Sequence, residues 1–154
     1  MKKKIIITGG LGYIGTELCK LYSGVSWHHE IIVIDNRFIS ERVNQIRNWN
    51  MEFIQGDILV KELVQKYCEN ADVVHHLAGV TDVPRTQSEA SKAQDEKIIE
   101  VGERGTQNII DSISDKCKII FPSTHVVYEG IDEIKTAIKE NEITKPVLSY
   151  SSSK

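Results

Sequence analysis

Residues 4–15 read KIIITGGLGYIG, in which three consecutive isoleucines lead into a cluster of four glycines. The isoleucine run is apolar without alternation, which is typical of a strand that helices bury on both faces. Gly9 permits a tight turn, Gly12 lets the backbone approach a pyrophosphate, and Gly15 lets a helix pack closely on the strand. The stretch therefore predicts a strand, a phosphate-binding loop and a helix whose N-terminal amides hold the phosphate.

Short apolar runs recur along the chain and alternate with stretches of helical periodicity. The further runs lie at residues 31–35, 52–56, 72–78 and 117–123. The helical stretches lie at residues 13–24, 58–70 and 88–114, with a shorter one near 132–139. Strands separated by helical crossovers build a parallel sheet. We therefore expect an α/β fold, a doubly wound Rossmann-type parallel sheet of strand order 3-2-1-4-5, with the fifth strand at an exposed edge.

An acidic residue stands where a dinucleotide-binding fold needs one. Asp35 closes the second predicted strand, twenty residues after Gly15. A carboxylate at this place accepts hydrogen bonds from the ribose hydroxyls of an adenosine, and it repels the 2′-phosphate of NADP. NAD is therefore favoured, although Arg37 could soften that repulsion. A glycine turn without a ligand is the alternative, whereas a P-loop is excluded because no Gly-Lys-Ser/Thr follows the glycines.

Composition narrows the class of protein. The chain has 154 residues, 40% of them hydrophobic, which fits one domain. The net charge of -3, with 27% charged residues of both signs, offers no basic surface, so we expect no nucleic-acid partner. Three scattered cysteines form no metal-binding pattern and indicate a reducing compartment. Too few apolar residues precede the glycines for a signal peptide or a membrane span, so we expect a cytoplasmic protein without membrane contact.

Several segments resemble one known family. The TGGLGYIG segment, residues 8–15, resembles the TGxxGxxG form of the short-chain dehydrogenase/reductase superfamily, in particular its extended branch of nucleotide-sugar epimerases and dehydratases. The QGDI segment (55–58), the HHLAG segment (75–79) and the GTQNII segment (105–110) continue the resemblance. The resemblance and the glycine motif together imply NAD as cofactor, held by Gly9, Gly12, Tyr13, Ile14, Gly15, Asp35, Asn36, Asp57, Ile58, Leu77, Ala78, Gly79 and Lys154.

The PSTHVVYEG segment, residues 122–130, resembles the strand-five segment that carries a catalytic Ser or Thr four residues before a Tyr. By that register Thr124 is the catalytic hydroxyl and Tyr128 a structural tyrosine. The glycine that the family places next to this tyrosine is displaced by Glu129 to Gly130. A His-Val pair follows the hydroxyl where sugar 4,6-dehydratases carry Asp-Glu, which disfavours a dehydratase of that type.

The YSSSK segment, residues 150–154, resembles the YxxxK signature of the superfamily. On a helix this spacing brings the two Cβ atoms about 5–6 Å apart, and a nearby ammonium favours the phenolate form of a tyrosine. The resemblance makes Tyr150 the base that takes a proton from a sugar hydroxyl, with Thr124 bonded to the reacting oxygen and Lys154 also on the nicotinamide ribose. Because a single helical turn is unfavourable by itself, we expect Tyr150 to be poorly held.

Two features of the interior carry structural expectations. Gly102 and Gly105 each cost about 1 kcal/mol relative to alanine within a helix, which indicates close packing against a neighbour. The family usually has an asparagine where this chain has Gly102. His75 and His76 point to opposite faces of a strand, so we expect core packing and no metal site.

The resemblance implies an NAD-dependent epimerase that transiently oxidises a hydroxyl of a UDP- or GDP-linked sugar. A non-catalytic NAD-binding module remains an alternative, as does another extended short-chain enzyme: a reductase, a decarboxylase or a dehydratase. Members of the family continue with further strands and a substrate domain. We therefore expect residues 1–154 to be an incomplete NAD-binding Rossmann domain that is inactive alone and belongs to a homodimeric full-length protein.

Overall fold

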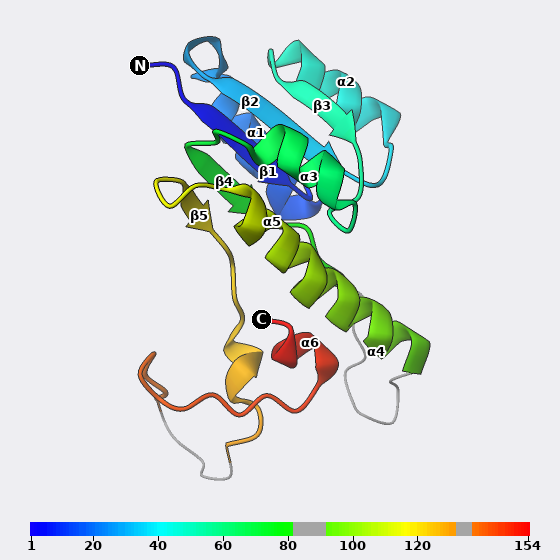
Figure 1. The fold of residues 1–154 in the computed structure, drawn as a ribbon, viewed down its shortest axis with the longest axis vertical. Helices are drawn as coiled ribbons and strands as arrows, with labels where there is room; N and C mark the ends of the chain where they lie inside the picture. Colours follow the sequence, from blue (N-terminus) through cyan, green and yellow to red (C-terminus); the bar gives the residue numbers. More distant parts are fainter. Residues whose placement is uncertain (82–91, 132–136) are drawn as a thin grey trace. The chain divides into compact units, whose positions relative to one another are not determined.

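The computed structural model describes residues 1–81, 92–131 and 137–154. The chain divides into two compact units, of which the first comprises residues 1–79 and 104–122 and the second residues 80–103 and 123–154. The first unit holds a parallel sheet of order β3-β2-β1-β4-β5 (Figure 1). Its strands are β1 (Lys4–Thr8), β2 (Glu30–Asp35), β3 (Glu52–Gln55), β4 (Val73–His76) and β5 (Lys118–Ile120). The predicted α/β class and strand order are confirmed.

The helices of the first unit follow the crossovers of the sheet. They are α1 (Tyr13–Ser23), the 3-10 helix η1 (Ser26–His28), α2 (Ser40–Asn48), α3 (Lys61–Cys68) and α5 (Thr106–Ser112). The start predicted for α3 at residue 58 is wrong, since the helix begins three residues later. Helix α2 was not predicted, because Val43 and Ile46 are its only buried residues and the rest of it is polar.

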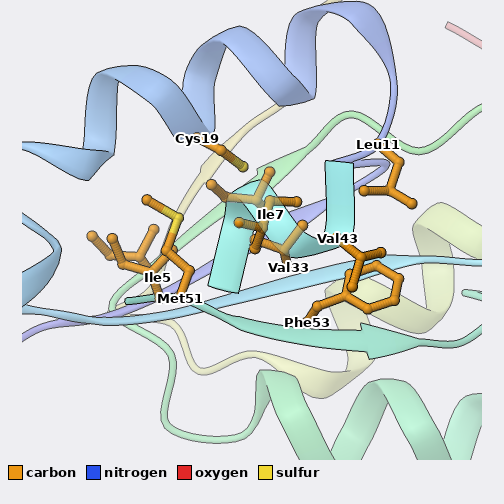
Figure 2. Packing of buried hydrophobic residues seen from close by; sticks show 10 residues of the cluster. Ile5, Ile7, Leu11, Cys19, Val33, Val43, Met51 and Phe53 are labelled. Carbon is orange, nitrogen blue, oxygen red and sulfur yellow. The ribbon is translucent and has the colours of Figure 1, made fainter. Parts of the chain in front are cut away.

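Isoleucine and valine side chains of adjacent strands form the core of the first unit. Ile7 of β1 lies in register with Val33 of β2, and both are fully buried. Figure 2 shows these two residues beneath Cys19 of α1, with Phe53 of β3 close to Val43 of α2. Alternate residues of the same strands, such as Ile6, are buried on the opposite face. Burial of both faces explains why the runs 5–7 of β1 and 31–34 of β2 are apolar without alternation.

The described part of the predicted helix at 88–114 is divided into three segments. Helix α4 (Lys92–Ile99) is followed by the π-helical segment η3 (Glu100–Gly105) and then by α5. A Cβ on Gly102 would lie 2.6 Å from Cβ of Ser153, and one on Gly105 would lie 2.5 Å from Cδ1 of Ile58. The predicted close packing at both glycines is confirmed, whereas the wider π turn was not predicted.

The second unit also contains the 3-10 helix η4 (His125–Tyr128) and the short helix α6 (Ser149–Ser152). Of the helix predicted near 132–139, residues 132–136 lie outside the described part, and residues 137–139 are not helical. In the first unit Ile119 and Ile120 of β5 are each 38% exposed, as expected for an edge strand. Within the ranges described, no helix has the length and apolarity to cross a bilayer.

Candidate functional site

The predicted cofactor residues of the first unit gather at one edge of the sheet, beyond the carboxyl ends of its strands. Parallel strands bring their carboxyl ends together, and each of β1 to β4 contributes a following loop. The residues placed there are Gly9, Gly12, Tyr13, Ile14, Gly15, Asp35, Asn36, Asp57, Ile58, Leu77, Ala78 and Gly79. The fold therefore assembles this group from four separate segments of the chain.

The glycine loop begins directly after β1. Gly9 has a φ of 69°, and an added Cβ would lie 2.6 Å from the backbone nitrogen of Ala78, so only glycine fits. Gly12 precedes α1, and no side chain caps that helix. The first-turn amides of α1 therefore keep the character of an anion site, beside the exposed side chains of Tyr13 and Ile14. This backbone fits a pyrophosphate group.

Asp35 is buried at the end of β2 and is engaged by the protein itself. Its Oδ2 accepts the backbone N–H of Leu11 at 2.9 Å. Its Oδ1 accepts the backbone N–H of Arg37 at 3.0 Å, and the guanidinium reaches both oxygens, at 3.1 Å from Nε and 3.3 Å from Nη2. The hydrogen bond to Asp35 raises the pKa of Arg37 above its ordinary value. A ribose hydroxyl can donate a hydrogen bond to Asp35 only if the Arg37 side chain, which is 56% exposed, releases one of its hydrogen bonds to the carboxylate.

Asn36 and Asp57 form a second polar contact beside Asp35. The side-chain amide of Asn36 donates to Oδ2 of Asp57 at 3.2 Å. Oδ1 of Asp57 accepts the backbone N–H of Leu59 at 2.9 Å, which fixes the turn before α3. Ile58, between Asp57 and Leu59, is buried, and its carbonyl accepts a hydrogen bond from the side-chain amide of Asn108 at 2.9 Å. These contacts hold the loops after β2 and β3 in one place.

Two hydroxyls and a buried histidine connect the glycine loop to α5. Oγ1 of Thr8 lies 2.8 Å from Nδ1 of His76 and accepts the backbone N–H of Ala78 at 3.2 Å. Nε2 of His76 lies 3.0 Å from Oγ1 of Thr106. The expected burial of His76 is confirmed, since it is 1% exposed, but this hydrogen-bonded chain was not predicted. Its signal in the sequence is a polar residue at the end of each of two apolar strands.

His75 points to the other face of β4 and is also buried. Its Nε2 lies 2.8 Å from the hydroxyl of Tyr22 in α1, and the two rings meet edge to face. Burial lowers the pKa of His75, and the positive charge of Lys118 lowers it further. The imidazole therefore stays neutral at neutral pH. Neither histidine belongs to a group that could hold a metal ion, and the residues described contain no such group.

The predicted catalytic residues Thr124, Tyr150 and Lys154 all belong to the second unit. Tyr150 lies in α6, and Nζ of Lys154 stands 5.5 Å from the centroid of its ring, within the range of a cation–π contact. Burial lowers the pKa of Lys154 below its ordinary value. The turn therefore brings the ammonium to the aromatic ring, as the spacing of the two residues predicts.

Thr124 occupies the N-cap of η4. Its Oγ1 accepts the backbone N–H of Val126 at 3.3 Å, and this hydrogen bond holds the hydroxyl in place without using its own hydrogen. A hydroxyl has one hydrogen to donate in addition. Thr124 can therefore offer its O–H to an oxygen of a bound molecule while the cap remains intact.

The expectation of an unsupported turn around Tyr150 is wrong. The carboxylate of Glu129 accepts the backbone N–H groups of Val147 and Leu148, which immediately precede α6. On another side Ser153 packs against Gly102 of the π-helical segment. These contacts join residues far apart in the chain, so no local sequence pattern predicts them.

The cysteines take no part in either group. Cys19 and Cys68 are buried, and desolvation raises the pKa of the Cys19 thiol to about 12 and that of Cys68 to about 11. Burial also raises the pKa of Cys117. Thiols are nucleophilic as thiolates, so these residues contribute packing rather than chemistry.

Comparison with known proteins shows the family to which the chain is similar, over a range that includes the predicted cofactor residues and the predicted catalytic residues. The model of the 3-beta hydroxysteroid dehydrogenase/isomerase family matches residues 6–154. A UDP-N-acetyl-alpha-D-glucosaminuronate decarboxylase from Bacillus cytotoxicus is 32% identical over 130 residues, which are 83% of this chain and 38% of the relative. A CDP-paratose 2-epimerase from Salmonella typhi is 31% identical over 153 residues, which are 92% of this chain and 42% of the relative.

Solved structures agree with the sequence relatives. A variant of the UDP-glucuronic acid 4-epimerase from Bacillus cereus, in complex with NAD and a fluorinated UDP-glucuronic acid, matches with a TM-score of 0.77 and 26% identity. The match covers 99% of this chain and 48% of the epimerase. The chain thus spans less than half the length of these relatives, and the resemblance to the extended short-chain dehydrogenase/reductase superfamily is confirmed.

Proposed function

Because the chain belongs to the 3-beta hydroxysteroid dehydrogenase/isomerase family, we propose that it supplies the NAD-binding and proton-transfer part of a nucleotide-sugar epimerase. The observation that carries the proposal is the pairing of Tyr150 with Lys154, 5.5 Å from the ring centroid to Nζ, on a helical turn. A glycine loop and a buried Asp35 in the other unit complete the set of groups that such an enzyme needs. The named relatives act on UDP- and CDP-linked sugars, which supports a sugar nucleotide as substrate.

Each group has a distinct role in this proposal. The first-turn amides of α1 bind the pyrophosphate. Asp35 accepts hydrogen bonds from the ribose hydroxyls once Arg37 gives up part of its contact with the carboxylate. Tyr150 takes the proton of a sugar hydroxyl at its phenolate oxygen, and Thr124 donates a hydrogen bond to the same sugar oxygen. Lys154 offsets the negative charge of the phenolate. Bound NAD supplies the capacity to accept hydride from the sugar carbon and to return it.

Epimerisation follows if the keto sugar rotates within the site, so that hydride returns to the opposite face of the oxidised carbon. Tyr150 then gives back the proton that it took, so the enzyme ends as it began. A decarboxylase uses the same oxidation step, and the similarity to a decarboxylase from Bacillus cytotoxicus makes this the second candidate. The two reactions differ in their products, because only the decarboxylase releases carbon dioxide.

The assay for turnover uses the longest reading frame that contains this chain. Purified protein is incubated with NAD and a panel of UDP-, CDP- and GDP-linked sugars, together with a 3-beta-hydroxysteroid, and the products are separated by chromatography. Tyr150→Phe is expected to lower kcat roughly 100-fold or more, because general acid–base groups contribute on this scale. Tyr67→Phe, a tyrosine of α3, is the matched control. Equal turnover by the Tyr150→Phe variant would exclude the assigned role.

A separate titration distinguishes an enzyme from a module that only binds NAD. Calorimetry of the 154-residue chain with NAD is expected to give saturable heat, and Asp35→Asn is expected to weaken binding. Asparagine retains an oxygen for Leu11 but loses the charge that the ribose hydroxyls contact. Asp115→Asn removes the same charge at an exposed position and should bind as the parent does. Binding in a protein that turns over no substrate would favour the non-catalytic alternative.

A further inference from the structure

One glutamate contacts residues on both sides of Tyr150 in the sequence. Glu129 directly follows η4, and its Oε1 accepts the backbone N–H of Val147 at 2.8 Å and that of Leu148 at 2.7 Å. The hydroxyl of Ser151, which is 1% exposed, also donates to Oε1. A single carboxylate oxygen therefore holds the two residues that enter α6 and one residue within it.

The backbone next to Glu129 fixes where this carboxylate stands. Lys145 donates its backbone N–H to the carbonyl of Val127 at 2.9 Å, and Gly130 donates its own to the carbonyl of Lys145 at 2.9 Å. A Cβ on Gly130 would lie 2.5 Å from that carbonyl oxygen. The order Glu-Gly after Tyr128 is thus matched to its surroundings, since one position supplies an acceptor oxygen and the next has no room for a side chain.

Helix α6 needs such support because it has only four residues. Formation of a first helical turn fixes several residues for little gain in hydrogen bonding. Leu148 is the N-cap, and its apolar side chain cannot accept a hydrogen bond from the first-turn amides. Glu129 instead accepts the backbone N–H groups of Val147 and of Leu148, which fixes the chain where it enters the helix.

The charge of Glu129 fits this role. Glu129 is exposed; desolvation raises the pKa of its carboxyl, but the hydrogen bonds from Ser151 and from the amides of Leu148 and Val147 lower it more. The pKa therefore lies below the ordinary value, and the carboxylate is ionised at neutral pH. Charge-assisted hydrogen bonds of this kind are stronger than neutral ones.

We propose that Glu129 is a positioning residue, which clamps the entry of α6 so that Tyr150 and Lys154 share one face of a formed helical turn. Glu129 acts on the reaction only through these two residues. The consequence for catalysis rests on the proposed function, whereas the placement of Tyr150 can be measured without any turnover. The sequence gives no hint of the clamp, because Glu129 and Leu148 lie 19 residues apart.

The test uses fluorotyrosine in the 154-residue chain and fluorine NMR. The chain has five tyrosines, and the resonance of Tyr150 is assigned by its loss in Tyr150→Phe. In Glu129→Ala we expect this resonance to move to the position that it has in the unfolded chain. We also expect the amides of residues 150–154 to exchange roughly tenfold faster, as the loss of charge-assisted hydrogen bonds predicts. Tyr22, which contacts His75 in the first unit, reports whether that unit remains folded.

Two further variants separate the clamp from a general loss of charge. Glu129→Gln keeps an acceptor oxygen at the same reach and is expected to retain the native Tyr150 resonance. Glu140→Ala removes an equal charge from an exposed position in the same unit and should change nothing. An unchanged Tyr150 resonance in Glu129→Ala would overturn the proposal, as would a shift in which Tyr22 moves equally, or equal disruption by Glu129→Gln.

Activity then connects placement to chemistry. In the longest reading frame we expect Glu129→Ala to lower kcat and Glu129→Gln to restore most of it, with KM for NAD unchanged in both. Absence of turnover in the parent protein would contradict the proposed function while leaving the NMR result valid. A shift of the Tyr150 resonance without any fall in kcat would overturn the catalytic consequence alone.

Discussion

At the scale of single residues, Asp35 shows how a carboxylate that is expected to bind the cofactor can also be engaged by the protein itself. The carboxylate accepts a backbone N–H from the glycine loop and pairs with Arg37 through both of its oxygens. The ion pair is partly solvated on the arginine side, with 56% of that side chain exposed. Solvent screening weakens such a pair, so Arg37 is available to move or to meet an added negative charge.

The position of Arg37 leads to a prediction about cofactor choice. We expect Arg37→Leu to increase the preference for NAD over NADP by roughly threefold to tenfold, because the guanidinium no longer offsets the repulsion between Asp35 and a 2′-phosphate. Titration calorimetry with both dinucleotides gives the ratio of the two Kd values. Arg47→Leu, in the last turn of α2, removes the same charge elsewhere and should leave the ratio unchanged. An unaltered ratio in both variants would contradict the assignment.

Buried His75 predicts a dependence of stability on pH. Its pKa is lowered in the folded protein, mainly by burial, whereas an unfolded histidine titrates near pH 6.5. Above that pH the imidazole is neutral in both states and the stability is complete. As the pH falls below it, the unfolded chain takes up a proton that the folded chain does not, so the free energy of unfolding decreases until the folded pKa is reached.

Urea unfolding between about pH 7.5 and pH 5 measures this loss. His75→Gln keeps a partner for Tyr22 and should flatten the pH dependence. His28→Gln, at an exposed position, should leave it as in the parent protein. A slope that is identical in His75→Gln and the parent would show that His75 is not its source.

At the scale of elements, the strands were predictable and several contacts between elements were not. The central strands β1 and β2 are runs of β-branched residues buried on both faces, a signal that is local in the sequence. Helix α2 has only two buried residues, so its period is hidden among polar ones. The clamp at Glu129 and the chain from Thr8 through His76 to Thr106 depend on residues that only the fold brings together.

The π-helical segment carries a prediction about α6. Gly102→Ala places a methyl group 2.6 Å from Cβ of Ser153. Overpacking of this kind costs about 1–3 kcal/mol, which exceeds the gain of up to about 1 kcal/mol from helix propensity. We therefore expect a lower free energy of unfolding and faster amide exchange at residues 150–154.

A compensating substitution isolates that contact. Gly102→Ala combined with Ser153→Gly removes the blocking side chain, and this double variant should recover most of the slow exchange. Gly24→Ala is the matched control, because no atom lies within 4 Å of its added Cβ. Exchange at residues 150–154 as slow in Gly102→Ala as in the parent would mean that the helix accommodates the methyl group elsewhere.

At the scale of the whole molecule, the chain divides its chemistry between two units. The groups expected to bind the cofactor belong to one unit, except for Lys154, which belongs to the other unit together with Thr124 and Tyr150. The strands and the glycine loop followed from the sequence because each is a local pattern of residues, and the strand order followed from the fold class that they indicate. The contacts that support the turn carrying Tyr150 did not follow from the sequence, since Glu129 and Leu148 lie 19 residues apart in the chain.

The edge of the sheet carries the last prediction. Ile119 and Ile120 of β5 are each 38% exposed at the end of the strand order, and an apolar edge strand is a template for pairing with another chain. We expect the 154-residue chain to self-associate with rising concentration, and Ile119→Lys to shift it toward the monomer in sedimentation velocity. Leu21→Lys places the same charge on α1, where a leucine is 78% exposed, and should not change association. Because only an unpaired edge offers backbone donors and acceptors, equal effects of the two substitutions would assign the association to general surface hydrophobicity instead.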